Sequence, residues 1–370
     1  MNRKRIAAFG FRSIPPQAGC AGADKFAEEL FTRLVEKGFE VTAYNRLYNN
    51  TVPESDNYKG INIASIKTTN KKGFDTLLHS LKATWHIIRN NTGDIIHIQN
   101  GGNSIWALFL RMAGKKVFIS QDGVDWKRDK WPWYGKLYLY VSSIITAYIP
   151  NSVIFDNVFV KEIFEKKFKK KFNFIPFGSE VRTDFEESKI LEQLGLMPND
   201  YFLFVGRFIP DKGLQYLVPA FEKIKTDKKL VLVGGSPNPS EFESSLRSTT
   251  DERILFPGFI YGADSNALMK NAYAYIQPSD VEGLSPVILE NMGLGTPVIC
   301  SDIKENIYVV DDTALTFKQG DTDDLEKTLE FSLEHPEVLR ENSIKAKART
   351  DKLFTWDVVT NQHIELFCSK

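Results

Sequence analysis

Short apolar runs alternate along the chain with longer segments whose apolar residues recur at helical spacing. The runs predict strands over Arg5–Phe11, Phe39–Tyr44, Ile61–Ile66, Asp94–Ile98, Val117–Ser120 and Val153–Phe155, and the longer segments predict helices over Ala23–Lys37 and Phe74–Asn90. The strand segments are continuously apolar, which indicates a sheet that is buried on both faces. This alternation of strand and helix predicts an α/β fold with a doubly wound parallel sheet.

The same pattern starts again after a polar stretch, in which Asp184–Lys189 is charged and Met197–Asp200 has the composition of a turn. Strands are then predicted over Tyr201–Val205, Leu230–Val233, Ile254–Phe256, Tyr273–Ile276 and Pro297–Cys300, with helices over Leu214–Lys225, Ala263–Asn271 and Pro286–Gly295. We therefore expect a first Rossmann-like domain over 1–183, a second over 184–351, and a C-terminal helix over 352–370 that packs back on the first.

Composition excludes several classes of protein. The 370 residues carry 47 basic and 47 acidic side chains, and this zero net charge argues against nucleic acid as the main partner. The three cysteines and five histidines are scattered, so we expect no disulfide framework, no metal site and a reducing compartment. The first apolar run is cut short by Arg12 and Pro15, and no apolar stretch reaches 18 residues, so we expect a cytoplasmic protein without a signal peptide or a membrane-spanning helix.

A loop of small residues follows the first predicted strand. It runs from Arg12 to Asp24, includes Gly22, and leads into a helix. Such a loop brings backbone N–H groups and a helix N-terminus close to a phosphate. The spacing is not G-x-G-x-x-G, and a merely flexible loop is the alternative.

Two cations follow the first strand of the second domain. Arg207 and Lys212 stand five residues apart around a turn, in the segment Val205–Gly213. Cations at the end of a strand are suited to neutralising a diphosphate that leaves as an anion. A pair of solvated charges on a turn is the alternative.

The strongest pattern lies between Pro278 and Ile299. A loop carries Glu282, and Ser285 and Pro286 are suited to the N-cap and the first position of a helix. The start of that helix offers free N–H groups to a phosphate, and Glu290, about one turn inside it, is placed to bind a ribose. We expect this combination to serve function rather than surface structure.

A fourth candidate follows the predicted strand Val117–Ser120. Asp122 stands at the end of this strand, and Trp126 and Trp131 come shortly after it. The tryptophans offer apolar faces that are suited to stacking on a sugar, and a structural tryptophan core is the alternative.

With these motifs in place, the sequence resembles the family 4 glycosyltransferases of the GT-B fold over nearly its whole length. The resemblance is carried by Gly206-Arg207, Lys212-Gly213, the pair Glu282 and Glu290, Pro297–Ser301 and Ile175-Pro176-Phe177-Gly178. The family implies two Rossmann-like domains that face a cleft. It also implies retention of the anomeric configuration without a metal ion or another cofactor.

The N-terminal half narrows the resemblance to a bacterial, rhamnosyltransferase-like subgroup of surface-polysaccharide assembly. The motifs are Phe9–Pro16, Gly22–Glu29 and Asp122–Arg128. The implied substrates are a UDP- or dTDP-sugar donor and a glycan or lipid-linked acceptor.

The resemblance also implies roles for single residues. Gly22 lies against the diphosphate and sugar, Arg207 and Lys212 hold the diphosphate, Glu282 binds donor-sugar hydroxyls, the backbone of Gly283, Leu284 and Ser285 approaches sugar and phosphate, and Glu290 takes the ribose. Many relatives carry histidine where this chain has Asp122, so the histidine contact to the sugar does not transfer unchanged. A nucleotide-sugar epimerase of the same fold and a non-catalytic sugar-binding protein are the alternative functions.

Two segments of the first domain favour a peripheral contact with the inner face of a membrane. Lys161–Phe172 is strongly basic with interleaved phenylalanines, and Trp131–Tyr148 is rich in aromatic residues. A basic amphipathic surface is suited to an anionic bilayer, and a solvated helix face is the alternative.

Overall fold

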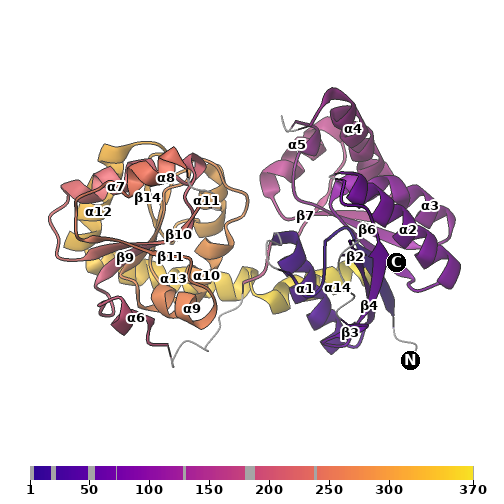
Figure 1. Ribbon diagram of the computed structural model, residues 1–370, viewed down its shortest axis with the longest axis horizontal. Helices are drawn as coiled ribbons and strands as arrows, with labels where there is room; N and C mark the ends of the chain where they lie inside the picture. Colours follow the sequence, from indigo (N-terminus) through magenta and orange to yellow (C-terminus); the bar gives the residue numbers. More distant parts are fainter. Residues whose placement is uncertain are drawn as a thin grey trace. The chain divides into compact units, whose positions relative to one another are not determined.

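The computed structural model describes residues 4–17, 22–48, 55–71, 73–127, 131–179, 188–236 and 240–369. The chain divides into two compact units, the first comprising Met1–Gly178 with Trp356–Lys370 and the second Ser179–Thr355 (Figure 1). The predicted domain boundary at 183/184 lies among residues 180–187, outside the described residues. At the other end, a helix runs through 351 and 352, and the second unit ends at Thr355.

The first unit is built on an eight-stranded sheet in the order β3-β4-β2-β1-β5-β6-β7-β8. Its strands are β1 (Arg5–Phe9), β2 (Glu40–Leu47), β3 (Asn57–Tyr58), β4 (Ile61–Lys67), β5 (Ile95–Gln99), β6 (Lys116–Gln121), β7 (Ser152–Phe155) and β8 (Asn173–Phe174). All neighbours pair in parallel except β3 with β4. The near-parallel sheet and its apolar strands confirm the doubly wound α/β prediction.

Helices cover both faces of this sheet (Figure 1). They are α1 (Gly22–Glu36), α2 (Phe74–Asn90), α3 (Ala107–Met112), α4 (Trp133–Tyr148), α5 (Val158–Phe168) and α14 (Trp356–Cys368), with short 3₁₀ turns η1 (Gly101–Trp106) and η2 (Asp125–Lys127). One buried cluster joins the sheet to α1 and α14, and another joins it to α2 and α3. The helices α2, α3, α4 and α5 connect β4, β5, β6, β7 and β8 in turn, and each connection moves toward the β8 edge of the sheet. Because crossovers between parallel strands are right-handed, these four helices lie on one face.

The second unit is built on a six-stranded sheet in the order β11-β10-β9-β12-β13-β14, in which all neighbours are parallel. Its strands are β9 (Tyr201–Arg207), β10 (Lys229–Gly235), β11 (Ile254–Gly258), β12 (Ala274–Gln277), β13 (Val298–Ser301) and β14 (Leu315–Phe317). Its helices are α6 (Ile190–Gln193), α7 (Leu214–Lys223), α8 (Glu241–Leu246), α9 (Gly262–Asn271), α10 (Pro286–Leu294), α11 (Lys304–Val310), α12 (Thr322–Glu334) and α13 (Pro336–Leu353), with the 3₁₀ turn η3 (Pro210–Lys212). Two buried clusters, one on each face of the sheet, form its core.

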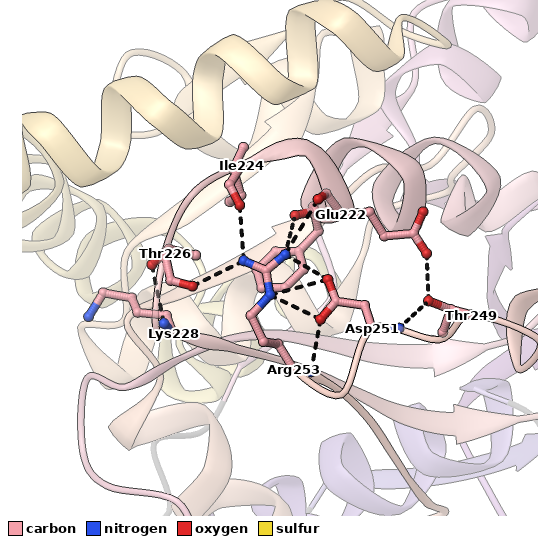
Figure 2. Close-up of polar contacts among 8 residues, drawn as sticks. Glu222, Ile224, Thr226, Lys228, Thr249, Asp251 and Arg253 are labelled. Atoms are coloured by element: carbon pink, nitrogen blue, oxygen red, sulfur yellow. Dashed lines mark hydrogen bonds and ion pairs between the residues drawn. The ribbon is translucent and has the colours of Figure 1, made fainter.

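Arg253, just before β11, makes several polar contacts at the amino end of that strand (Figure 2). Its guanidinium donates to the carbonyl oxygens of Ile224 at 2.9 Å and Thr226 at 3.0 Å, and pairs with Asp251 at 2.6 Å. Hydrogen bonds from Arg253 hold the pKa of Asp251 below its ordinary value. Because ligands of open α/β sheets bind at the opposite, carboxyl edge, we assign this network to structure: it ties the end of α7 to β11.

Trp356 anchors α14 inside the first unit. Its side chain is 4% exposed, and its ring centroid lies 5.7 Å from that of Phe26 and 5.2 Å from that of Phe177. A Cβ atom on Gly178 would lie 2.3 Å from the Trp356 ring, so this glycine makes room for the indole. The glycine of the Ile175–Gly178 motif therefore has a packing role.

Replacing Trp356 by alanine is expected to lower the free energy of unfolding of the first unit by about 3–5 kcal/mol, because it empties a buried aromatic site. Urea denaturation followed by circular dichroism measures the effect. Trp133→Ala is the matched control, since Trp133 is 76% exposed and its loss is expected to change stability by about 0.5 kcal/mol or less. Equal destabilisation by the two substitutions would contradict the packing role of Trp356.

Candidate functional site

The candidate residues of the second unit gather where the order of its strands reverses. From β9 the chain proceeds to β10 and β11 on one side, then returns to β12 on the other side, so that β9 and β12 are neighbours. Arg207 ends β9, and the loop that carries Glu282 follows β12. The carboxyl ends of strands at such a switch point are the usual ligand site of an open α/β sheet.

Lys212 and Glu282 meet directly at this edge. The Lys212 Nζ atom donates to Glu282 Oε1 at 2.5 Å, and the side chains are 20% and 8% exposed. Ser279 Oγ donates to the same oxygen at 2.6 Å, and Gln277 Nε2 also donates to it. A carboxylate and an ammonium are thus held together in a poorly solvated place, where their electrostatic attraction is stronger than in bulk water.

The position of Lys212 depends on a close approach of two loops. The N–H of Asp280 donates to the carbonyl of Asp211 at 2.9 Å, which joins η3 to the loop after β12. Gly213 follows with φ +74°, and a Cβ there would lie 1.8 Å from the carbonyl oxygen of Pro278. Only glycine fits this position, so the Lys212-Gly213 pair of the sequence has a steric basis.

Arg207 differs from Lys212 in its surroundings. Its side chain is exposed, and within the described part of the chain it makes no hydrogen bond or ion pair. A guanidinium at a strand end is therefore available to an anion, while the neighbouring ammonium is already paired with a carboxylate.

Helix α10 begins as the sequence predicts. Ser285 is its N-cap and accepts from the N–H of Ile288 at 3.4 Å, Pro286 is its first residue, and Gly295 ends it in the left-handed conformation. Gly283 is exposed ahead of the cap, Leu284 is half-buried, and Glu290 lies one turn inside the helix. Free N–H groups at such a helix start favour a bound anion.

Glu282 and Glu290 act on the same buried phenol. Burial first, and then the charges of Glu282 and Glu290, raise the pKa of Tyr275 well above its ordinary value. Burial and these two negative charges keep the Tyr275 hydroxyl protonated.

The first unit contributes Gly22 and Asp122. Gly22 is the exposed first residue of α1, and the preceding residues 18–21 of the loop lie outside the described part of the chain. Asp24, buried in the first turn of α1, accepts from the N–H of Arg12 at 2.6 Å and ties the helix to the loop. Asp122 is exposed directly after β6.

A second carboxylate that sequence analysis missed lies near Asp122. Asp156 follows β7, and β6 and β7 pair with Gln121 opposite Phe155, so the two aspartates follow neighbouring strand ends. Burial, and secondly the charge of Asp122, raise the pKa of Asp156 to about 7. A signal was available, because each aspartate directly follows an apolar strand.

Trp126 packs inside the first unit. Its ring centroid lies 5.2 Å from that of Phe164, and Lys167 Nζ lies 5.3 Å from its centre. Residues 128–130 of the predicted Asp122–Arg128 motif and its surroundings lie outside the described chain. Among the described residues, no group of three or more His, Cys, Asp or Glu side chains is placed to hold a metal ion.

Part of the second unit resembles known glycosyltransferases in sequence. Residues 199–335, which lie within the second unit, match the family described as "Glycosyl transferases group 1". The chain is 27% identical over 184 residues to O-antigen chain mannosyltransferase B of Escherichia coli, and the alignment covers 48% of each chain. It is 26% identical over 294 residues to the uncharacterized glycosyltransferase MJ1607 of Methanocaldococcus jannaschii, covering 73% of this chain and 74% of that one.

Solved structures define the fold. Sucrose-phosphate synthase from Thermosynechococcus elongatus matches with a TM-score of 0.79 at 21% identity, over 99% of this chain and 98% of that one. HepE of Anabaena in complex with UDP matches with a TM-score of 0.76 at 16% identity, over 98% of each chain. The fold is thus GT-B, as the resemblance implied. The whole chain thus shares this fold, and residues 199–335 match the group 1 glycosyltransferases.

The alignment with the E. coli mannosyltransferase spans about half of that relative's length. The activity of that relative is therefore not assigned to this chain. The comparisons support a resemblance to group 1 glycosyltransferases, and the relatives include mannosyltransferases. The narrower rhamnosyltransferase-like subgroup stays a prediction.

Asp156 gives the first unit a specific pH dependence. The folded state keeps its proton up to about pH 7, whereas the ordinary pKa is 3.8, so stability falls as pH rises between these values. Asp156→Asn cannot ionise, and its melting temperature relative to wild type is expected to rise from about pH 5 to about pH 8. Thermal melts across this range test it.

Asp122→Asn is the control for this titration. Removing the nearby charge is expected to lower the pKa of Asp156. The fall in stability then ends at a lower pH and is smaller than in wild type, whereas Asp156→Asn abolishes it. A difference between Asp156→Asn and wild type that stays constant with pH would show that Asp156 is ionised throughout.

Proposed function

We propose that the protein is a retaining glycosyltransferase that moves a sugar from a nucleotide diphosphate to a glycan or lipid-linked acceptor in bacterial polysaccharide synthesis. The observation that supports this most is the Lys212–Glu282 pair at the switch point of the second unit, where Arg207 ends β9 and α10 follows the loop that carries Glu282. The cations and the helix N-terminus are suited to the negatively charged diphosphate. The carboxylate is suited to the hydroxyl groups of the sugar.

The diphosphate is assigned to Arg207, Lys212 and the backbone ahead of α10. Lys212 has three N–H donors, and Glu282 takes one of them, so the remaining donors are available to phosphate oxygens. Exposed Arg207 adds a forked donor. The N–H groups near Gly283, Leu284 and Ser285, together with the dipole of α10, complete the anion site.

The sugar and the ribose are assigned to the two glutamates. Glu282 accepts hydroxyls of the donor sugar, and Glu290 accepts those of the ribose, one turn further along α10. Gly22 of the first unit is assigned to the loop that approaches the diphosphate and sugar. Asp122 is assigned to sugar or acceptor hydroxyls in place of the histidine of many relatives.

The reaction we propose is a front-face displacement. The bond from the anomeric carbon to the phosphate oxygen breaks, a bond to the acceptor oxygen forms on the same face, and the acceptor proton passes to the departing phosphate. Negative charge grows on the diphosphate, and fixed cations and helix N–H groups stabilise it without reorganisation. No metal ion or other cofactor takes part in this proposal.

The donor and the acceptor follow from weaker observations. HepE, whose fold this chain shares, was solved with UDP and with UDP-glucose, which supports a UDP- or dTDP-sugar donor. The resemblance to O-antigen chain mannosyltransferase B supports an acceptor of the surface-polysaccharide type.

We further propose that the enzyme works in the cytoplasm and rests on the inner face of the membrane through one face of its first unit. Exposed large hydrophobic side chains concentrate on α2, α3 and α4: Phe74, Leu81, Trp85, Leu108, Phe109, Met112, Trp133, Tyr134, Leu137, Tyr140, Val141, Ile144 and Tyr148. These helices lie on the same side of the sheet. An apolar surface of this kind, on a chain of which no described helix is long and apolar enough to span a bilayer, fits interfacial contact.

Lysines border this apolar face. The last turn of α5 contains Lys166 and Lys167, and Lys169, Lys170 and Lys171 follow the helix. Lys167 Nζ lies 4.4 Å from the ring centre of Tyr140 on α4. The whole chain is neutral, so this local excess favours an anionic lipid surface over a neutral one.

The structure corrects one part of the sequence interpretation here. The phenylalanines interleaved with the lysines, Phe164, Phe168 and Phe172, are buried in a core cluster with Val153 and Phe155. They fill the space beside β7 and are not available to a bilayer. The apolar part of the surface is therefore supplied by α2, α3 and α4, and α5 supplies charge.

Lys212→Ala is expected to lower kcat about 10²–10³-fold, because it removes one fixed cation from the leaving diphosphate. The donor is first chosen by a thermal-shift screen of UDP-, dTDP- and GDP-sugars, since a bound donor raises the melting temperature by mass action. Lys223→Ala, which removes a lysine paired with Asp323 on the surface of the second unit, is the control and is expected to leave kcat unchanged.

Turnover with and without acceptor separates the alternatives. Conversion of the donor to another nucleotide sugar without acceptor would indicate an epimerase, and binding without any turnover would indicate a sugar-binding protein. Full activity of Lys212→Ala would count against the proposed site.

The membrane proposal predicts that the full chain sediments with vesicles of phosphatidylcholine and phosphatidylglycerol, and much less with phosphatidylcholine alone. The pair Lys166→Glu and Lys169→Glu is expected to weaken binding about tenfold or more, because each basic residue contributes about 1 kcal/mol near an anionic surface. Trp133→Ser with Tyr134→Ser is expected to weaken binding through lost apolar contact.

Phe259→Ser with Tyr261→Ser is the matched control, since these stacked aromatic side chains of the second unit are 51% and 76% exposed but lie outside the face. Equal loss of binding in this control, or equal sedimentation with both kinds of vesicle, would contradict the assigned surface.

A further inference from the structure

A chain of polar side chains runs through the core beneath Glu282. Tyr275 and Gln277 both belong to β12, and being two residues apart they point to the same side of the sheet. The Tyr275 hydroxyl donates to Gln277 Oε1, and Gln277 Nε2 donates to Ser279 Oγ at 2.7 Å and to Glu282 Oε1. The chain thus leads from the buried strand to the carboxylate of the candidate site.

These groups lie in a place where apolar side chains would normally stand. Tyr275 and Ser279 are completely buried, and Gln277 is 2% exposed. Burying polar groups costs free energy unless every one of them is hydrogen-bonded, and an apolar core avoids that cost altogether. The network therefore calls for a role beyond packing.

The network has a fixed direction. The raised pKa of Tyr275 keeps its phenol protonated, so the hydroxyl donates and the amide oxygen of Gln277 accepts. The NH₂ group of the amide must then face Ser279 and Glu282. Reversal of the amide would set its oxygen against the Glu282 carboxylate, which is unfavourable because both are acceptors.

The same network orients the two oxygens of Glu282. The hydrogen bonds from Lys212, Ser279 and Gln277, which are those the described residues make to this side chain, all end on Oε1. Ser279 is itself held from below, because Ser301 Oγ donates to its carbonyl at 2.6 Å and Asn306 donates to Ser301 Oγ at 3.0 Å. One oxygen is thus fixed by the protein, which leaves Oε2 to accept from a ligand.

We propose that Gln277 and Tyr275 are positioning residues that fix the rotamer of Glu282 and so present Oε2 to the hydroxyls of the donor sugar. This inference rests on the proposed function, in which Glu282 binds that sugar. We call the hydrogen-bonded chain from Tyr275 through Gln277 to Glu282 the relay. In this proposal the relay serves recognition of the sugar, whereas Lys212 and Arg207 bind the diphosphate.

The test compares a nucleotide sugar with its nucleoside diphosphate. The probes are UDP-glucose with UDP, dTDP-glucose with dTDP and GDP-mannose with GDP, and the pair that raises the melting temperature of wild type most is used. Gln277→Met keeps the length of the side chain and removes its donors. By calorimetric titration it is expected to raise Kd for the nucleotide sugar about tenfold or more, and Kd for the diphosphate by less than about twofold.

Tyr275→Phe is expected to act in the same direction with a smaller effect, and to add nothing further in the Gln277→Met background, because both substitutions break one relay. Tyr201→Phe is the matched control. Tyr201 is also completely buried, and its hydroxyl donates to the carbonyl of Leu268 at 2.6 Å, outside the relay. It is expected to lose stability without any change in either Kd.

Each outcome has a distinct meaning. Equal weakening of sugar and diphosphate in Gln277→Met, or a loss of sugar affinity in Tyr201→Phe, would overturn the relay while the proposed function stands. A wild-type protein that binds none of the three pairs would overturn the proposed function, and the relay with it.

Discussion

The site depends on the ion pair between Lys212 and Glu282. Two segments that are 70 residues apart in sequence meet there, because β9 and β12 are neighbours at the point where the order of strands reverses. The pair is stable only if other donors also satisfy the poorly solvated carboxylate, which Ser279 and Gln277 do. Gly213 allows the close approach of the two loops, and the Ser285 cap sets the start of α10 beside them. Parallel strand order, glycine sterics and helix capping thus act together to place an ammonium, a carboxylate and free N–H groups at one edge of a sheet.

The two units divide the work of the enzyme in the function we propose. In this proposal the second unit holds a charged site for the donor, which suits a reaction whose main demand is stabilisation of a departing diphosphate. The first unit carries an apolar face on α2, α3 and α4 with lysines at its border, which suits an acceptor that is held at a membrane. Asp122 and Asp156 follow neighbouring strands of this unit, and burial together with the like charge of Asp122 raises the pKa of Asp156.

Much of the fold was predictable because its strands are continuous apolar runs and its helices have a clear period. Strands of two residues, such as β3 and β8, carry too little pattern to be found. Arg207, Lys212, Glu282 and Glu290 were visible as charged residues after strands or at a helix start, but the partner of Lys212 was not, since it depends on a pairing of distant strands. Gln277 gave only the weak signal of a polar residue at the end of an apolar strand. The phenylalanines of 161–172 were predicted to face a membrane, but they are buried in a core cluster. Their alternation with lysine looks the same in the sequence whether the rings face solvent or a core.

The central claim is that Lys212, Arg207 and the start of α10 form one pyrophosphate site whose carboxylate neighbour stays in place. A crystal structure with bound UDP, or with the nucleoside diphosphate that binds more tightly, tests it most directly. The account predicts phosphate oxygens at about 3 Å from Lys212 Nζ and from the Arg207 guanidinium, with Glu282 Oε1 still bonded to Ser279. A diphosphate bound elsewhere, or a Lys212 that remains paired with Glu282 alone while the ligand is bound, would contradict it.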